Sequence, residues 1–232
     1  MNKREKERKV IKELIHTKCL EAIGNPDISK YLDEIRSYNK ELYSHSINVA
    51  VLSVVIGINV LDREKDIKDL FTSALLHDYG KLYVSKRILN KKDTLTRNER
   101  CEMEKHPLYG YRRLNQDNKL SNDILMGILD HHERIDGSGY GNGKCEDEIS
   151  KFAKIIMIAD VYDAMISDRV YRKKLGRGIA YEYLFKKAGT DFCRPEIRCF
   201  INTTISLDLD YVISEFTKNI FENSIEKLVT NR

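Results

Sequence analysis

The sequence predicts an all-α protein, because proline is rare and apolar residues recur at helical spacing over long stretches. Only three prolines occur in 232 residues, at positions 26, 107 and 195. Apolar residues return with a period of about 3.6, which places them on one face of a helix. No linker, internal repeat or low-complexity tract divides the chain, so we expect one helical unit with its own core.

The first half of the chain contains four predicted helices. Residues 5–23 form an amphipathic helix that ends at the Gly-Asn-Pro stop signal at 24–26, and a shorter helix covers 27–38. Residues 45–60 are apolar on almost every side, which predicts a central buried helix. Residues 64–78 form the next helix, with one apolar face.

In the middle of the chain, capping residues predict where the helices begin. A short helix is expected near 86–90. Thr96 and Glu99 fit a capping box that opens a helix running to about residue 115, in spite of Pro107 inside it. Ser121 is the expected cap of a further helix that reaches the histidine pair at 131–132.

The second half begins with a loop. Residues 133–149 are rich in glycine and charge and show no period, which is typical of a functional loop. Residues 151–166 are strongly apolar and predict a second central helix. Two or three helices are expected beyond residue 178, the last of them over about 210–228.

Charge and cysteine content favour no special partner or compartment. Lys and Arg number 40 against 36 Asp and Glu, and a basic run near the N-terminus is interpreted as a solvated helix face. The five cysteines are scattered without a CxxC pair, so we expect reduced thiols. The chain has no run of about 18 apolar residues and a charged N-terminus, so we expect a cytoplasmic protein that binds neither a membrane nor a long nucleic acid.

Histidines and aspartates stand where the predicted core helices should be apolar. His45 opens the most apolar helix, His77 and Asp78 end the next, and Asp160 interrupts the apolar run 155–161. A carboxylate buried there must be paired, protonated or bound to metal. Each residue alone is explained by an ordinary core histidine or a helix-end charge, but the set favours a metal cluster. Its histidines are His45, His77, His106, His131 and His132.

The spacing of these residues fits a shared site. Glu41 and His45 lie four residues apart on one helix face, and Asp160 and Asp163 lie three apart on another. Mixed imidazole and carboxylate ligands suit iron, manganese or zinc better than calcium or magnesium. More ligands are present than one ion needs, so we expect two ions bridged by Asp78, an arrangement used for phosphodiester hydrolysis.

The motifs that carry these residues follow one another in a recognisable order. They are 45–50 (HSINVA), 74–81 (ALLHDYGK), 106–110 (HPLYG), 131–140 (HHERIDGSGY), 159–164 (ADVYDA) and 168–172 (DRVYR). This ordered set resembles the HD-GYP subfamily of the HD superfamily of metal-dependent phosphohydrolases, over residues 41–200. Residues 1–40 are then an N-terminal helical extension packed on the core, and 201–232 a C-terminal helical extension of the same unit.

The resemblance implies an HD-domain helical bundle that hydrolyses a cyclic dinucleotide, most directly cyclic di-GMP to pGpG and/or GMP, by a metal-activated hydroxide at a bi- or trinuclear site. The implied metal ligands are His45, His77, Asp78, His106, His131, His132 and Asp160. Glu41 matches a position that supplies a ligand in trinuclear members; the alternative is an ordinary carboxylate in the first turn of a helix. Two or three divalent ions are expected, iron or manganese, with zinc or nickel as adventitious occupants.

The resemblance also implies roles in catalysis and substrate binding. Asp78 and Lys81 would be catalytic, with Lys81 stabilising charge on the phosphate or protonating the leaving group. The implied substrate-binding residues are Tyr140, Asp163, Arg169 and Arg172. The two arginines would hold the second phosphate, Tyr140 would stack or hydrogen-bond near the substrate or pack on its own domain, and Asp163 would alternatively orient a ligand or the water.

One departure from the family pattern leaves alternatives open. Gly139, Tyr140 and Gly141 stand where the family has Gly-Tyr-Pro. Another nucleotide or a hybrid cyclic dinucleotide therefore remains an alternative substrate. Hydrolysis of a phosphomonoester on the same fold is an alternative activity, although the simpler HD enzymes need fewer histidines than this sequence has. A third hypothesis is a non-catalytic domain that senses a cyclic dinucleotide or docks a partner. Regulation is expected from the N-terminal helices, from a homodimer or from a regulatory protein partner.

Overall fold

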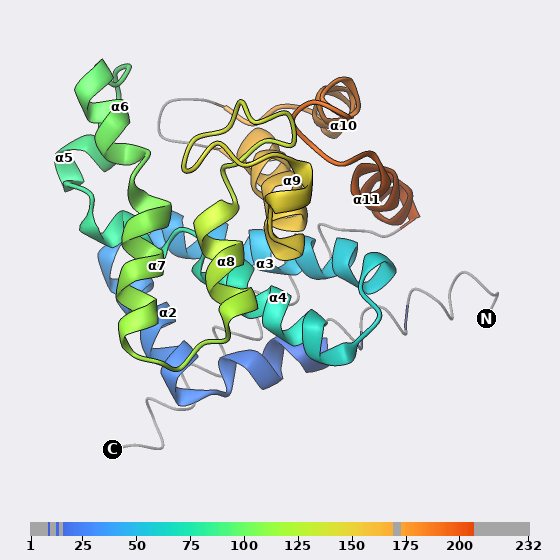
Figure 1. Ribbon diagram of the computed structural model, residues 1–232, viewed down its shortest axis with the longest axis horizontal. Helices are drawn as coiled ribbons and strands as arrows, with labels where there is room; N and C mark the ends of the chain where they lie inside the picture. The colour runs from blue at the N-terminus through green and yellow to red at the C-terminus, as the bar shows by residue number, and fades with distance from the viewer. Residues whose placement is uncertain (1–8, 10–12, 14–15, 169–172, 207–232) are drawn as a thin grey trace.

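The regular elements of the chain are helical, as the sequence predicts. In the computed structural model, the residues that the structure describes are 9, 13, 16–168 and 173–206. Residues 16–23 are helical and precede the named elements. These are α2 (Pro26–Tyr38), α3 (Lys40–Val60), α4 (Glu64–Leu76), η1 (Tyr79–Tyr83), α5 (Lys86–Leu89), α6 (Arg97–Met103), α7 (His106–Gln116), α8 (Asn122–Asp130), η2 (Glu146–Glu148), α9 (Lys151–Ile166), α10 (Arg177–Lys186) and α11 (Arg194–Ser206) (Figure 1).

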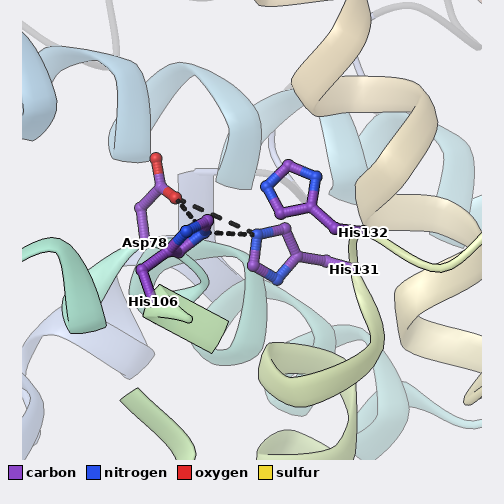
Figure 2. A group of neighbouring side chains, drawn as sticks. All are labelled: Asp78, His106, His131 and His132. Atoms are coloured by element: carbon purple, nitrogen blue, oxygen red, sulfur yellow. Dashed lines mark hydrogen bonds and ion pairs between the residues drawn. The ribbon is translucent and has the colours of Figure 1, made fainter. Parts of the chain in front are cut away.

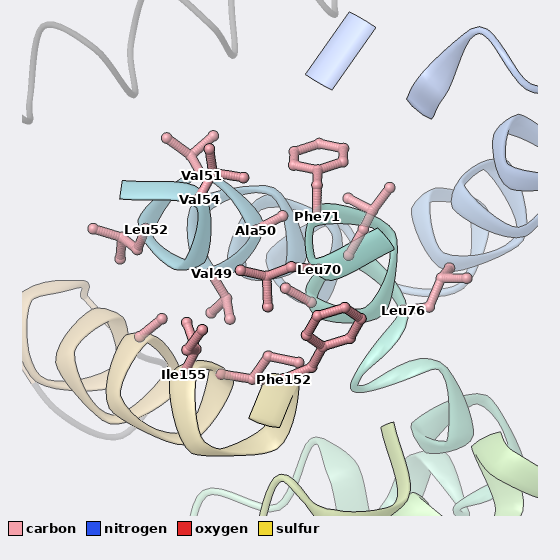
Figure 3. Packing of buried hydrophobic residues seen from close by; sticks show 14 of the residues in the cluster. Val49, Ala50, Val51, Leu52, Val54, Leu70, Phe71, Leu76, Phe152 and Ile155 are labelled. Carbon is pink, nitrogen blue, oxygen red and sulfur yellow. The ribbon is translucent and has the colours of Figure 1, made fainter. Parts of the chain in front are cut away.

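The core is built around α3, which packs against α2, α4, α9 and α11. Figure 3 shows α4 and α9 on neighbouring sides of α3, with Leu70, Phe152 and Ile155 packed where these helices meet. Each fully buried aliphatic or phenylalanine side chain contributes about 1.5–3 kcal/mol relative to its exposed state. Helix α3 is long and apolar enough to cross a membrane, yet 72% of this apolar stretch is buried inside the fold. Its composition is that of a central core helix.

Capping side chains mark where the helices begin. Helix α3 begins at Lys40, earlier than the predicted residue 45, because the Asn39 side chain accepts a hydrogen bond from Leu42 N at 2.9 Å. Ser121 caps α8 as predicted. The predicted division into residues 1–40, 41–200 and 201–232 remains a prediction, and the predicted helix at 210–228 lies outside the described residues.

The prediction of one continuous helix from Thr96 to about residue 115 was wrong. Thr96 and Glu99 do form the predicted capping box, but the helix they open, α6, ends at Met103. A separate helix, α7, begins at His106, with Pro107 in its first turn. Proline is tolerated there because the first backbone N–H groups of a helix have no partner within it. The break places His106 at a helix start, where its side chain turns into the interior.

Helix α7 lies unusually close to η1. A Cβ atom added to Gly80 would lie 1.9 Å from the carbonyl oxygen of His106 and 2.5 Å from Gly110 N. Only glycine allows the two backbones to approach this closely. This contact sets the distance between Asp78, which precedes η1, and His106.

Candidate metal centre

Five histidines converge at one place in the interior, and most of them lie at helix ends. His77 and His131 are the C-terminal cap residues of α4 and α8, His106 opens α7, and His132 follows His131. His45 lies in α3. Aspartates complete two groups whose ligand atoms all lie within 4.8 Å of one another. One group is His45, His77 and Asp160. The other, shown in Figure 2, is Asp78, His106, His131 and His132.

Asp78 is shared between the two groups. Its Oδ2 atom lies 3.5 Å from His45 Nε2 and 3.4 Å from His77 Nε2. Its Oδ1 atom lies 3.1 Å from His106 Nε2 and 3.9 Å from His131 Nε2. Asp160 joins the first group, with Oδ1 3.1 Å from His45 Nε2. One buried carboxylate therefore faces a cluster of imidazoles with each of its oxygens, which is the geometry of a bridging ligand.

Backbone hydrogen bonds fix the orientation of three imidazoles. The Nδ1 atoms of His77, His106 and His131 lie 2.7–2.8 Å from the carbonyl oxygens of the residues three positions earlier, Ala74, Met103 and Ile128. Because a carbonyl only accepts, each Nδ1 carries the proton and donates it. Each Nε2 then keeps its lone pair and directs it at the centre.

Several buried atoms at the centre lack a hydrogen-bond donor. His77 Nε2 and Asp78 Oδ1 are buried without a hydrogen-bond partner. The Nε2 atoms of His106 and His131, both lone-pair acceptors in these tautomers, lie 3.3 Å apart. Leaving a buried acceptor unsatisfied costs about 1–3 kcal/mol. Divalent transition ions would satisfy all these atoms, and the mixed N and O donor set suits them, so the residues present fit such ions.

The electrostatics favour the ligand form of two imidazoles and of Asp78. His45 differs, because burial alone would lower its pKa but the Asp160 and Asp163 carboxylates raise it to about 9. Burial, reinforced by the neighbouring imidazoles, holds the pKa values of His131 and His132 well below the usual range for histidine. Burial alone would raise the pKa of Asp78, but the Lys81 ammonium and His77 hold it well below its usual range. At neutral pH these two imidazoles are thus uncharged and Asp78 is ionised, as metal binding requires.

Asp163 lies behind the centre. Its buried carboxylate lies 2.6 Å from His45 Nδ1 and accepts hydrogen bonds from Asn48 Nδ2 at 2.9 Å and Ser167 Oγ at 3.0 Å. The residue is absent from the lining of the cleft described below. The structure therefore places Asp163 against His45 and away from the space where a substrate would bind.

A cleft of about 610 Å³ opens over the metal centre. His106 and His132 line it, together with Lys81, whose Nζ lies 2.5 Å from Asp78 Oδ2. Tyr140 lines it too, stacked on His132 with ring centroids 4.5 Å apart. Glu41 is exposed on the cleft wall and belongs to neither ligand group. Arg169 and Arg172 lie outside the described residues.

Comparison with known proteins agrees with this geometry. A family model for the HD domain matches residues 31–194. The chain belongs to the HD domain family. It is 34% identical over 186 residues to the cyclic di-GMP phosphodiesterase PdeB of Borreliella burgdorferi, which covers 80% of this chain and 47% of that protein. It is 38% identical over 128 residues to the 3'3'-cGAMP-specific phosphodiesterase 3 of Vibrio cholerae, covering 55% of this chain and 28% of the relative.

The solved structures support the same fold. Bd1817, an HDG"Y"P protein from Bdellovibrio bacteriovorus, superposes with a TM-score of 0.58 at 18% identity, covering 83% of this chain and 70% of that one. These matches confirm the predicted all-α HD fold and the predicted membership of the HD-GYP-like group. The chain spans half or less of the length of the two curated relatives named above.

Two acidic residues of the HD domain hold the glycine-rich loop and were not singled out by sequence reasoning. Glu133 is buried and accepts hydrogen bonds from the backbone N–H groups of Asn142 at 2.6 Å and Lys144 at 3.2 Å. Asp130, also buried, pairs with Lys144 Nζ at 2.8 Å. The loop has no periodicity, so the sequence signals these partners only through the position of Glu133 directly after the histidine pair.

Gly141, which replaces the family proline, has a conformation that proline does not adopt. Its φ is +135°, and a Cβ atom there would lie 2.8 Å from Glu133 Oε1. The proline ring fixes φ near −65°. The Glu133 carboxylate, rather than a proline, therefore fixes the loop in this HD domain and holds Tyr140 over His132.

Gly141→Pro, which restores the family motif, is expected to destabilise this protein. Backbone strain of about 1–3 kcal/mol corresponds to a Tm lowered by roughly 2–12 °C for a chain of this size. Gly176→Pro is the matched control, because Gly176 has φ −68° and open space around it. Calorimetry of both variants measures the difference. An unchanged Tm for Gly141→Pro would contradict the role assigned to the Glu133 carboxylate.

Proposed function

We propose that this HD domain is a metal-dependent phosphodiesterase that hydrolyses a cyclic dinucleotide, with cyclic di-GMP the first candidate and pGpG and/or GMP the product. The observation that carries the proposal is the division of the Asp78 carboxylate between two histidine clusters. Paired ions a few Å apart are the usual means of hydrolysing a phosphodiester. The similarity to relatives named as cyclic di-GMP phosphodiesterases supports the choice of substrate.

The two ligand groups define where the ions would bind. His45, His77 and Asp160 would hold one ion, and His106, His131 and His132 the other, with Asp78 common to both. Bound divalent iron or manganese supplies Lewis acidity, which lowers the pKa of water and offsets the charge of the phosphate. Zinc or nickel would be adventitious occupants. Glu41, on the cleft wall, remains the candidate ligand for a third ion.

Three side chains of the chain would act around these ligands. Lys81 lies beside Asp78 in the cleft, where its ammonium would stabilise negative charge on the phosphate or supply a proton to the leaving oxygen. Burial, together with the Asp160 and Asp78 carboxylates, raises the pKa of Tyr140, so its hydroxyl stays protonated and is able to donate to a phosphate oxygen. Asp163 would hold His45 in orientation as a positioning residue.

A hybrid cyclic dinucleotide is a second candidate substrate. One relative, 38% identical, is named for 3'3'-cGAMP, and the loop that covers His132 differs from the family motif at Gly141. A hybrid cyclic dinucleotide is therefore the second candidate. The cytoplasmic location, a homodimer and a regulatory protein partner remain predictions.

The proposal is tested by turnover. The protein, purified without oxygen and supplied with Fe²⁺ or Mn²⁺, is expected to convert cyclic di-GMP into a linear product, and a chelator should stop the reaction. Cyclic di-AMP, 3'3'-cGAMP and p-nitrophenyl phosphate are assayed in parallel. Hydrolysis of the monoester alone would overturn the proposal in favour of a phosphomonoesterase, and binding of cyclic di-GMP without turnover under either metal would favour a sensor.

A further inference from the structure

The cleft has a second wall that none of the proposed metal ligands belongs to. The segment from Ile88 to Leu95, with Arg100 and Met103 of α6, lines it. Figure 1 shows α5 and α6 standing together at one end of the molecule, beyond α7. This wall carries three cations, Lys91, Lys92 and Arg100.

The wall is fixed in place by its own hydrogen bonds. Lys91 Nζ lies 2.5 Å from Glu99 Oε2, and the same carboxylate accepts from Thr96 N at 2.8 Å in the capping box of α6. At the other end of the segment, Asn90 contacts Asn39, the cap residue of α3, at 3.4 Å between side chains. The segment is thereby tied both to α6 and to the helix that carries His45.

The charge of Lys91 is neutralised, whereas those of its neighbours are not. Within the described part of the chain, neither Lys92 nor Arg100 has a carboxylate within 4.0 Å of its charged group, although both line the cleft. Their charges are available to an anionic ligand. An ammonium and a guanidinium are the side-chain groups that bind phosphate oxygens best.

The rest of the lining indicates what kind of anion fits. Glu41 and Asp93 also line the cleft, so it is not uniformly basic. A simple polyphosphate would be repelled by both carboxylates and has no N–H groups to donate to them. A cyclic dinucleotide carries two separate phosphates and, on guanine, N–H groups that carboxylates accept, so it matches a wall of mixed charge.

We propose that Lys92 and Arg100 bind the phosphate of the cyclic dinucleotide that is not cleaved, while the scissile phosphate lies at the metal centre. This is the role that the sequence assigned to Arg169 and Arg172, which lie outside the described residues. This inference rests on the proposed function and adds a second phosphate subsite to it. Because the two phosphates lie on opposite sides of the macrocycle, a ligand held at the metal centre directs the other phosphate away from it. The wall from Ile88 to Leu95 lines the same cleft as His106 and His132.

The test compares a substrate that has two phosphates with one that has a single phosphate. Lys92→Gln, Arg100→Gln and the double variant are assayed on cyclic di-GMP and on bis(p-nitrophenyl) phosphate. We expect the ratio of kcat/KM for cyclic di-GMP to that for the single-phosphate ester to fall about tenfold for each substitution, as for one charge-assisted hydrogen bond. Arg97→Gln, which removes a charge from α6 outside the cleft lining, should leave the ratio unchanged.

Binding gives a readout that does not depend on turnover. Calorimetric titration of the metal-free protein with cyclic di-GMP should show Kd raised about tenfold by each cleft substitution and not by Arg97→Gln. Equal loss on both substrates would mean a general structural effect and would overturn the inference. If the double variant bound and cleaved cyclic di-GMP as well as the wild type does, this inference alone would be overturned. If the wild type hydrolysed the ester but neither bound nor cleaved cyclic di-GMP, the proposed function would be overturned as well.

Discussion

Asp78→Asn is expected to lose bound metal and to lower kcat/KM for a cyclic dinucleotide by about a thousandfold or more, since paired metal ions contribute several kcal/mol to transition-state stabilisation. Asparagine keeps the shape of the side chain but removes the charge that both histidine groups share. The oxygen that faces His45 and His77, or the one that faces the second group, is replaced by an NH₂ donor. That donor points at an imidazole nitrogen or at the ion it should bind.

Metal content per chain and steady-state kinetics, measured on one preparation, test this expectation. Asp66→Asn is the matched control, because Asp66 is another buried aspartate in ion pairs, with Arg63 at 2.7 Å and Lys151 at 2.7 Å, but lies outside the ligand groups. It should lower stability and leave the metal content unchanged. Retention of wild-type metal and activity by Asp78→Asn would contradict the bridging role.

Gly80→Ala is expected to have the largest effect on stability. The added Cβ would lie 1.9 Å from the His106 carbonyl oxygen and 2.5 Å from Gly110 N, both of them backbone atoms that move only with helix α7. Overpacking of this kind costs about 3 kcal/mol or more, which lowers Tm by roughly 6–12 °C. Because α7 carries His106 and η1 follows Asp78, moving them apart should also weaken metal binding.

Gly178→Ala is the control for this substitution. Gly178 lies in the first turn of α10 with nothing within 4 Å of the added Cβ, so alanine there should be neutral or slightly stabilising. Thermal unfolding and metal content are measured for both variants. If Gly80→Ala unfolded at the same temperature as the wild type, the close approach of η1 and α7 would not be what positions His106.

Sequence reasoning predicted the helices that carry the ligands, because buried polar groups in apolar runs are conspicuous. Asp160 inside an apolar helix demanded a partner, and the structure brings it to His45. Spacing along one helix, however, does not determine which helices meet. The excess of ligands predicted a bridging Asp78, but the way each of its oxygens meets a different histidine group depends on how α4, α7 and α8 pack.

Other features were hidden for identifiable reasons. A periodic apolar pattern interrupted by Pro107 is the same for one kinked helix and for two successive helices, so the break before α7 was missed. Asp163 was given two roles, substrate contact or orientation of a ligand, and its contact with His45 favours the second. Glu133 acts through backbone N–H groups of a loop without a period, and only its position directly after the histidine pair signals such contacts.

The most direct test of the shared metal centre is a titration of the metal-free protein with Fe²⁺ or Mn²⁺ without oxygen, in which bound metal and hydrolysis of cyclic di-GMP are measured together. We predict that activity rises with bound metal and reaches its maximum only when two ions or more are bound per chain. Full activity with no bound metal, or a maximum at a single ion, would contradict a centre in which Asp78 joins two ions.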